Sequence, residues 1–216
     1  MFFAPPGKLK RLGVVGLNQR NGDYISKLNR RSDYPKVDNK LITKQLAVSA
    51  GIAVPELYAV VETNHDAQRL ASLLAPYQDF VIKPAHGSGG EGIVVVDGRQ
   101  GKLFRKASGQ LVTLASLEHH VGNILSGMYS LGGQPDHAMI EYRVRFDPLF
   151  KDITFQGVPD IRTIVFKGYP VMAMVRLPTR TSDGKANLHQ GAVGAGINIA
   201  TGVTHHGVFN SLKIDH

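Results

Sequence analysis

The stretch DFVIKPAHGSGGEGIVVV, residues 79–96, constrains the fold of this chain more than any other part of it. It consists of a short apolar strand ending near Lys83, a loop with four glycines in six positions, and a second strand rich in β-branched residues. Glycines leave backbone N–H groups free to close on an anion, and the lysine adds a positive charge at the base of the loop. The stretch predicts a β-hairpin with a phosphate-binding loop, and a flexible hairpin with an unrelated lysine is the alternative.

Three common glycine motifs do not fit this loop. Gly87, Gly89 and Gly92 satisfy G-x-G-x-x-G, but a strand follows them where a dinucleotide fold needs a helix. Protein kinases carry their lysine on the next strand, with H-R-D and D-F-G motifs that this sequence lacks. A Walker loop has its lysine after the glycines. The order found here, lysine and then a glycine-rich hairpin, resembles the ATP-grasp superfamily.

Composition narrows the class of protein. The absence of cysteine excludes disulfides and thiolate metal sites, and no apolar stretch approaches the ~18 residues of a membrane span. We therefore expect a cytoplasmic protein. The net charge of +8 is concentrated in residues 1–50, which carry ten Lys or Arg and three Asp. This basic segment could dock a nucleic acid, an anionic lipid or an acidic peptide, but the sequence has no aromatic-interleaved RNA platform, so we expect no nucleic-acid partner.

A helix is predicted after Asp38, which we expect to be its N-cap, with Gly51 ending it. The run from Asp38 to Pro55 is similar to the start of the N-terminal subdomain of ATP-grasp ligases. That resemblance implies that Lys40 lines a nucleotide site, while an exposed lysine in the first helical turn is the alternative.

Two further helices and a strand are expected between residues 64 and 144. One helix covers residues 64–75, a second is capped by Ser116 and runs through Met128, and a strand covers residues 138–144. The corresponding strand of ATP-grasp enzymes ends in the hinge between two subdomains. The resemblance implies that Glu141 and Tyr142 lie against adenine.

The region 160–176 predicts an antiparallel hairpin in which Arg162 and Arg176 interrupt apolar strands. The pattern resembles the alpha-L-glutamate ligase (RimK-like) branch of the superfamily. It implies that Asp160 contacts the nucleotide and that both arginines face phosphate or an acidic substrate; structural ion pairs are the alternative. A loop similar to that of the same branch follows, and it implies that Lys185 and Asn187 lie over the triphosphate.

The resemblance extends from about Asp38 to His216 and implies an α+β ATP-grasp fold in which two α+β subdomains clasp ATP. We expect a basic N-terminal segment (1–37), an N-terminal subdomain with the glycine-rich flap (38–140), and the start of a C-terminal subdomain (141–216). ATP-grasp ligases hold Mg²⁺ with late acidic residues, but no glutamate follows Glu141 here. We therefore expect the C-terminal part of the fold to be missing from this chain, leave the metal ligands unassigned, and expect exposed apolar surface that favours a homodimer.

The function implied by the resemblance is that of an ATP-dependent carboxylate–amine ligase that works through an acylphosphate with ATP and Mg²⁺. Its substrates are a carboxylate and an amine, and glutamate, another amino acid and an acidic peptide are the candidates. Without the late acidic residues, we expect this chain alone to be inactive. The implied cofactor-binding residues are Lys40, Lys83, Gly87, Ser88, Gly89, Gly90, Gly92, Glu141, Tyr142, Asp160, Lys185 and Asn187, and the implied catalytic residues are Arg162, Arg176 and Asn187. The alternative function is a nucleotide-binding regulatory or interaction module without ligase activity.

Overall fold

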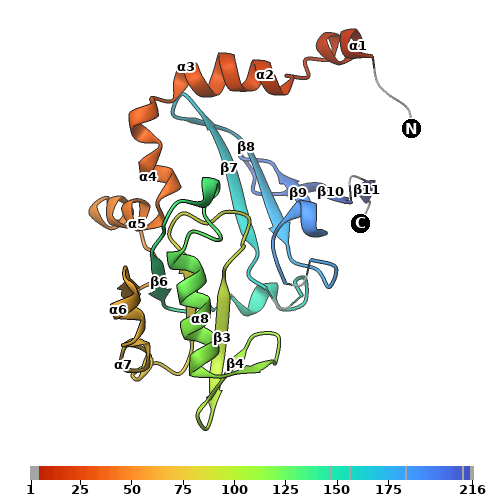
Figure 1. The fold of residues 1–216 in the computed structure, drawn as a ribbon. Helices are drawn as coiled ribbons and strands as arrows, with labels where there is room; N and C mark the ends of the chain where they lie inside the picture. The colour runs from red at the N-terminus through yellow and green to blue at the C-terminus, as the bar shows by residue number, and fades with distance from the viewer. Residues whose placement is uncertain (1–4, 146, 156, 183, 211, 215–216) are drawn as a thin grey trace. The chain divides into compact units, whose positions relative to one another are not determined.

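The computed structural model describes residues 5–145, 147–155, 157–182, 184–210 and 212–214 (Figure 1). The chain forms two compact units, Met1–Ile52 and Ala53–His216. The first is helical, and the second combines helices with two antiparallel sheets, so the predicted α+β class is confirmed. None of the helices in the described ranges is long and apolar enough to cross a membrane.

The first unit is a succession of short helical segments with no buried side chain among its described residues. Its elements are α1 (Pro6–Arg11), α2 (Leu17–Gln19), η1 (Arg20–Ile25), α3 (Ser26–Leu28), η2 (Arg31–Asp33), α4 (Pro35–Asp38) and α5 (Lys40–Ser49).

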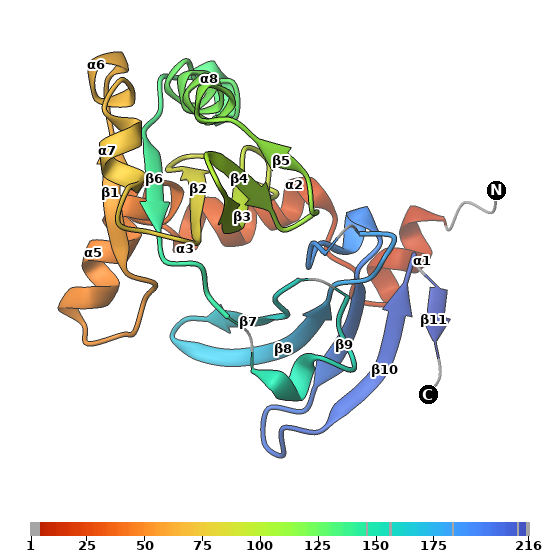
Figure 2. The same ribbon diagram turned by 90° about the horizontal axis from the view of Figure 1, so that it is seen from below.

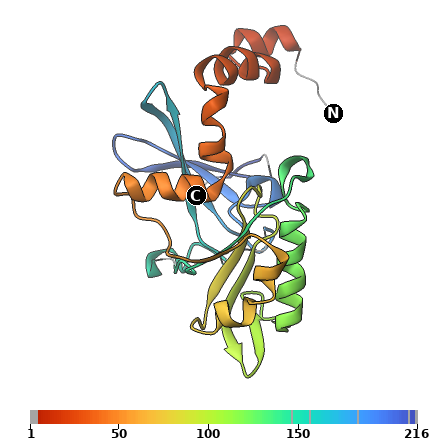
Figure 3. The ribbon, with the colours of Figure 1, turned by 60° about the vertical axis from the view of Figure 1, so that its left-hand side comes forward.

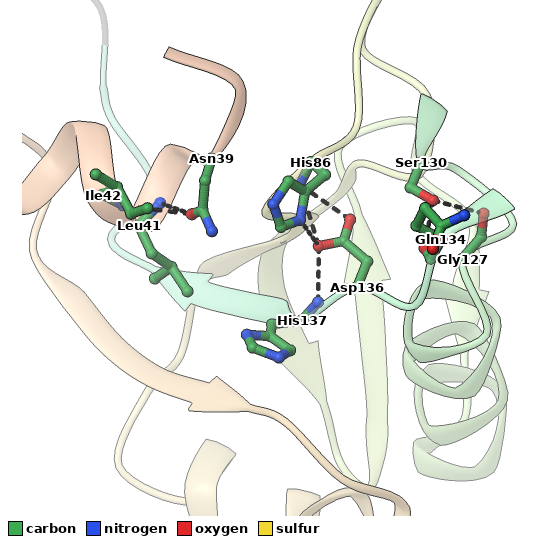
Figure 4. A network of polar contacts seen from close by, with 9 residues as sticks. All are labelled: Asn39, Leu41, Ile42, His86, Gly127, Ser130, Gln134, Asp136 and His137. Carbon is green, nitrogen blue, oxygen red and sulfur yellow. Dashed lines mark hydrogen bonds and ion pairs between the residues drawn. The ribbon is translucent and has the colours of Figure 1, made fainter. Parts of the chain in front are cut away.

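The N-cap of α5 is Asn39, so the prediction of Asp38 is wrong by one residue. Asp38 is still helical as the last residue of α4, whereas Asn39 has an extended backbone. The Asn39 side-chain oxygen accepts hydrogen bonds from the N–H groups of Leu41 at 2.9 Å and Ile42 at 3.3 Å (Figure 4). This geometry satisfies two of the donors that a helix start leaves without partners.

The larger sheet of the second unit has six strands in the order β1-β6-β2-β3-β4-β5, and all neighbouring pairs are antiparallel. Its strands are β1 (Leu57–Val61), β2 (Phe80–Pro84), β3 (Val94–Gln100), β4 (Leu103–Lys106), β5 (Leu111–Val112) and β6 (Ala138–Glu141). The strand predicted over 138–144 therefore ends earlier, at Glu141.

Three helices cover one face of this sheet: α6 (Asn64–Ala67), α7 (Leu70–Leu74) and α8 (Leu114–Leu125). Figure 2 shows α6 and α8 on that face, and Figure 3 shows α8, in green, running alongside the strands. The core lies between these helices and the sheet. It contains Leu70 and Leu74 from α7, Val121 and Ile124 from α8, and Phe80 from β2.

Two helix predictions need correction. The helix expected over 64–75 is two shorter helices, α6, which begins at a capping box formed by Thr63 and Asp66, and α7. The N-cap of α8 is Thr113, whose hydroxyl accepts from the Ser116 N–H, so Ser116 lies inside the helix. Met128 lies beyond the end of α8 and is exposed.

The smaller sheet has five strands in the order β11-β10-β9-β8-β7. Its strands are β7 (Asp160–Phe166), β8 (Tyr169–Leu177), β9 (Val193–Ile197), β10 (Thr204–Phe209) and β11 (Leu212–Ile214), and the short helical turns η3 (Leu131–Gly133), η4 (Pro148–Phe150) and η5 (Leu188–Gln190) lie in the loops of this unit. The predicted hairpin is confirmed as β7 and β8. Its turn residues Lys167 and Gly168 both have positive φ, as a tight hairpin turn requires.

Candidate functional site

A cleft of about 820 Å³ lies in the second unit, and its walls come from the part with the six-stranded sheet and from the part with the five-stranded sheet. On one side it is lined by residues of β2, β3, β4, the glycine loop and the segment after β6. On the other side it is lined by two loops of the five-stranded half, which contribute Gly157, Val158, Gly184 and Lys185. The cleft brings together four of the residues proposed from sequence, Gly90, Glu141, Tyr142 and Lys185.

The floor of the cleft follows from strand alternation. Phe80 and Ile82 of β2 point into the core under the helices, so Val81 points the other way and lines the cleft. Val95 lies opposite Val81 on β3 and also lines it. Ile93 adds a third apolar side chain. This apolar floor is suited to the flat face of a ring system.

Lys83 and Glu141 form an ion pair between neighbouring strands. Lys83 lies on β2 and Glu141 at the end of β6, and the Glu141 side chain is 5% exposed. The sequence had suggested that the lysine contacts phosphate and the glutamate contacts the nucleoside, each separately. In the structure the two charges contact each other, which holds both side chains in place, and Glu141 lines the cleft.

The segment after β6 begins at Tyr142, whose side chain lines the cleft. The Tyr142 N–H donates to the carbonyl of Glu56 at 2.8 Å, which extends the pairing of β6 with the chain before β1. That donor is therefore occupied by the protein's own backbone.

The glycine-rich loop is anchored at both ends and open in the middle. At its start, Gly87 bridges to Ser130 and packs closely on Pro84. At its end, a Cβ on Gly92 would lie 2.6 Å from the ring of Tyr129. The central Gly89 and Gly90 have positive φ and no atom within 4 Å of an added Cβ, and Ser88 lies beside them. The centre of the loop is thus free to approach a ligand.

A buried carboxylate fixes the residue before the loop (Figure 4). Asp136, with a side chain 1% exposed, accepts from the His86 N–H at 2.9 Å, from His86 Nδ1 at 2.7 Å and from the His137 N–H at 2.7 Å. Since Nδ1 faces the carboxylate, the other ring nitrogen, Nε2, is directed away from it. This pair was not predictable from the sequence, because nothing local connects residues 86 and 136.

A second histidine holds the other end of the loop. Nε2 of His120, on α8, donates to the carbonyl of Gly92 at 2.9 Å. Burial lowers the pKa of His120 below its ordinary value of 6.5, and this outweighs the bond to Gly92, which raises it. The ring also lies against Tyr129. The neutral form is therefore favoured in the folded protein.

Asp160 and Arg176 form a two-armed ion pair across the β7–β8 hairpin, where they lie directly opposite each other. Arg176 Nε lies 2.6 Å from Asp160 Oδ1, and the second arm joins Nη2 to Oδ2. This hydrogen-bonded pairing raises the pKa of Arg176. Arg162 shares the face of β7 that carries Asp160, is exposed, and has no ion pair with any residue in the described ranges.

The loop between β8 and β9 presents Lys185 to the cleft. Thr179 and Ser182 bond each other's backbone, and the Thr179 hydroxyl donates to the Gly191 carbonyl at 2.6 Å. Asn187 uses its side-chain oxygen to accept from the His189 N–H, which caps η5. Lys185 makes no ion pair within the described part of the chain. A fixed loop thus carries a cation that is available to a ligand.

Three arginines at the cleft were not proposed from the sequence. Arg143 and Arg145, which follow β6, both contact Asp79, and Arg105 of β4 contacts Asp97 at 2.8 Å. All three line the cleft. Arg143 and Arg145 lie two residues apart directly after an apolar strand, so both side chains point to the same side if the chain stays extended. This spacing was the sequence signal that could have identified them.

Lys40 is the first residue of α5 in the first unit, and its part in nucleotide binding stays a prediction. No group of three or more His, Asp or Glu side chains among the described residues could hold a metal ion.

The chain matches a model of a known protein family, described as sugar-transfer associated ATP-grasp, over residues 19–216. The match covers the second unit and the first unit from residue 19 onward, so it begins within the basic segment that the resemblance had left uncovered. No curated protein matches the chain.

Proposed function

Because the chain belongs to the sugar-transfer associated ATP-grasp family, which supports an ATP-dependent, ligase-type function on an ATP-grasp fold, we propose that it is a carboxylate–amine ligase. Its cleft would bind ATP, with Mg²⁺ carried by the phosphates. The RimK-like branch and a glutamate or acidic-peptide substrate belong to this proposal as well.

The observation that carries the proposal is the composition of the cleft. One cavity of about 820 Å³ is lined by an apolar floor, an open glycine loop and Lys185. Lys185 is a cation that makes no ion pair within the described residues. This volume lies within the ~300–1,000 Å³ typical of small-molecule sites. A purine would lie on Val81 and Val95, and the phosphates would lie between the loop around Gly90 and Lys185.

Recognition of the base would use backbone groups beyond Tyr142, since the Tyr142 N–H is already bonded to Glu56. The Lys83–Glu141 pair would hold the wall between base and phosphates. Neither group then needs to move when the nucleotide binds, and preorganised charges of this kind stabilise a moving phosphoryl group.

The proposed reaction has two steps. A carboxylate oxygen of the first substrate bonds to the γ-phosphorus as the bond to the β,γ-bridging oxygen breaks, which gives an acylphosphate and ADP. An amine then attacks the acyl carbon, a C–N bond forms, the C–O bond to phosphate breaks, and the amine loses a proton to solvent. In both steps the chain's own residues would position the substrates and screen their charges, and Arg162 is available to an acidic substrate.

An ADP-release assay over a panel of carboxylates and amines tests this reaction. Release that requires both a carboxylate and an amine supports the ligase, and a product analysed by mass spectrometry identifies the new amide. Tight ATP binding without any release over the panel contradicts ligase turnover by this chain and agrees with the expectation from the sequence that the chain alone is inactive.

The second candidate is a nucleotide-binding module without turnover. The apolar floor, the glycine loop and Lys185 account for nucleotide binding by themselves, so they favour this candidate as much as the ligase. ATP binding with no ADP release would support this candidate.

A further inference from the structure

We propose that Arg143 and Arg145 form an anion-binding subsite at the end of the cleft opposite the glycine loop, and that it takes a carboxylate or phosphate group. This inference goes beyond the proposed function, because the nucleotide phosphates lie at the other end of the cleft in that proposal.

Strand register separates the two ends. Lys83, near the loop, pairs with Met139, whereas Val81 pairs with Glu141 at the end of β6. Asp79 precedes β2 and lies a further two residues away. Four residues from Lys83 to Asp79 span on the order of 13 Å at ~3.3 Å per residue. The partners of Asp79 are therefore too far from the loop to serve the same phosphates.

The charges at this end are unbalanced. Arg143 Nη1 lies 3.5 Å and Arg145 Nη2 lies 2.9 Å from the same oxygen of Asp79, Oδ2. Two guanidinium groups thus share one carboxylate oxygen, and one positive charge is left over.

Most of the donors on these side chains remain available. A guanidinium has five N–H donors, and among the described residues each of the two arginines makes only its one bond to Asp79. The Arg143 side chain is 30% exposed and that of Arg145 is 69% exposed, and both line the cleft. A partly buried guanidinium with a single long bond is suited to a planar, two-oxygen anion, which it can bind through two parallel N–H bonds.

The opposite wall carries a further guanidinium, that of Arg105, which is already paired with Asp97. Gly98 leaves room for it, since a Cβ there would lie 3.1 Å from Arg105 Nη2. Because Arg105 and Asp97 both line the cavity, their charges cancel, and the unbalanced positive charge of the subsite comes from Arg143 and Arg145.

The test is an NMR titration of the full chain, without nucleotide, using inorganic phosphate and succinate as separate probes. We compare the parent with Arg143→Gln/Arg145→Gln, with the single variant Arg145→Gln, and with Arg69→Gln as a matched control on an exposed helix start. Arg145→Gln keeps Arg143 on Asp79, so the comparison holds even if the double variant is unstable.

We expect at least one probe to bind the parent, with affinity about tenfold lower in the double variant, severalfold lower in Arg145→Gln and within twofold of the parent in Arg69→Gln. The stronger probe identifies the anion as phosphate or carboxylate. ATP affinity should stay within twofold in the double variant. Failure of both probes to bind, equal probe affinity in parent and double variant, or an equal loss of ATP affinity would each overturn the subsite. Because the probes are titrated without nucleotide, these results are separate from the outcome for the ligase.

Discussion

Replacing Asp136 by alanine tests how the base of the glycine loop is built. The carboxylate accepts from two backbone donors, the N–H groups of His86 and His137, in a part of the chain where Asp136 itself is almost fully buried. A donor left without its acceptor costs about 1–3 kcal/mol, so the two together predict a loss of about 2–6 kcal/mol. The His86 ring adds little, because its side chain is 38% exposed and can turn to water. Such a loss is a large part of the ~5–15 kcal/mol that stabilises a typical protein.

Urea unfolding followed by far-ultraviolet circular dichroism measures this loss. Asp136→Asn should be less destabilising than alanine, because an oxygen at the Oδ1 position still accepts from His86 Nδ1 and the His137 N–H. Asp152→Ala, at an exposed turn, is the matched control and should change the free energy of unfolding by less than about 0.5 kcal/mol. If Asp136→Ala behaves like this control, the carboxylate does not organise the loop.

Three further predictions concern the loop, a titration and a cap. Gly92→Ala should destabilise the protein more than Gly89→Ala, since both have positive φ but only Gly92 meets the Tyr129 ring; equal unfolding midpoints would contradict this. The pKa of His120 is lowered in the folded state, so the unfolded state binds more protons and the stability of the protein falls as pH drops below about 6.5. His120→Gln should reduce the loss of stability between about pH 7.5 and pH 5. An unchanged pH dependence of stability in this variant would refute the prediction. Asn39→Ala should cost about 1 kcal/mol, and hydrogen exchange should speed up in the first turn of α5 but not in α8.

Local patterns predicted much of the second unit. The β-branched and apolar runs give β2, β3 and the β7–β8 hairpin, and the positive-φ turn at Gly168 follows from its glycine. Helix boundaries were less predictable, because several residues near a helix start can act as caps. Thr113 and Ser116 are both good N-caps, and only the backbone conformation selects Thr113.

The candidate site was predictable only in part. Lys185 and Gly90 line the cleft as a phosphate site would require, and their chemistry is visible in the sequence. The contact between Lys83 and Glu141 was not predictable, because it depends on β2 lying next to β6 although 58 residues separate them. Long-range pairs of this kind follow from sheet order, which a single sequence does not reveal.

Calorimetric titration of the full chain with ATP tests the central claim most directly. The parent should bind ATP, and Lys185→Ala should weaken binding by roughly one to two decades, because a charge-assisted hydrogen bond is worth about 1.5–3 kcal/mol. Lys151→Ala, at an exposed position outside the cleft, should bind like the parent, and both variants should keep the parent's unfolding midpoint. Absence of ATP binding by the parent, or equal affinity in the parent and Lys185→Ala, would contradict the assignment of this cleft as the nucleotide site.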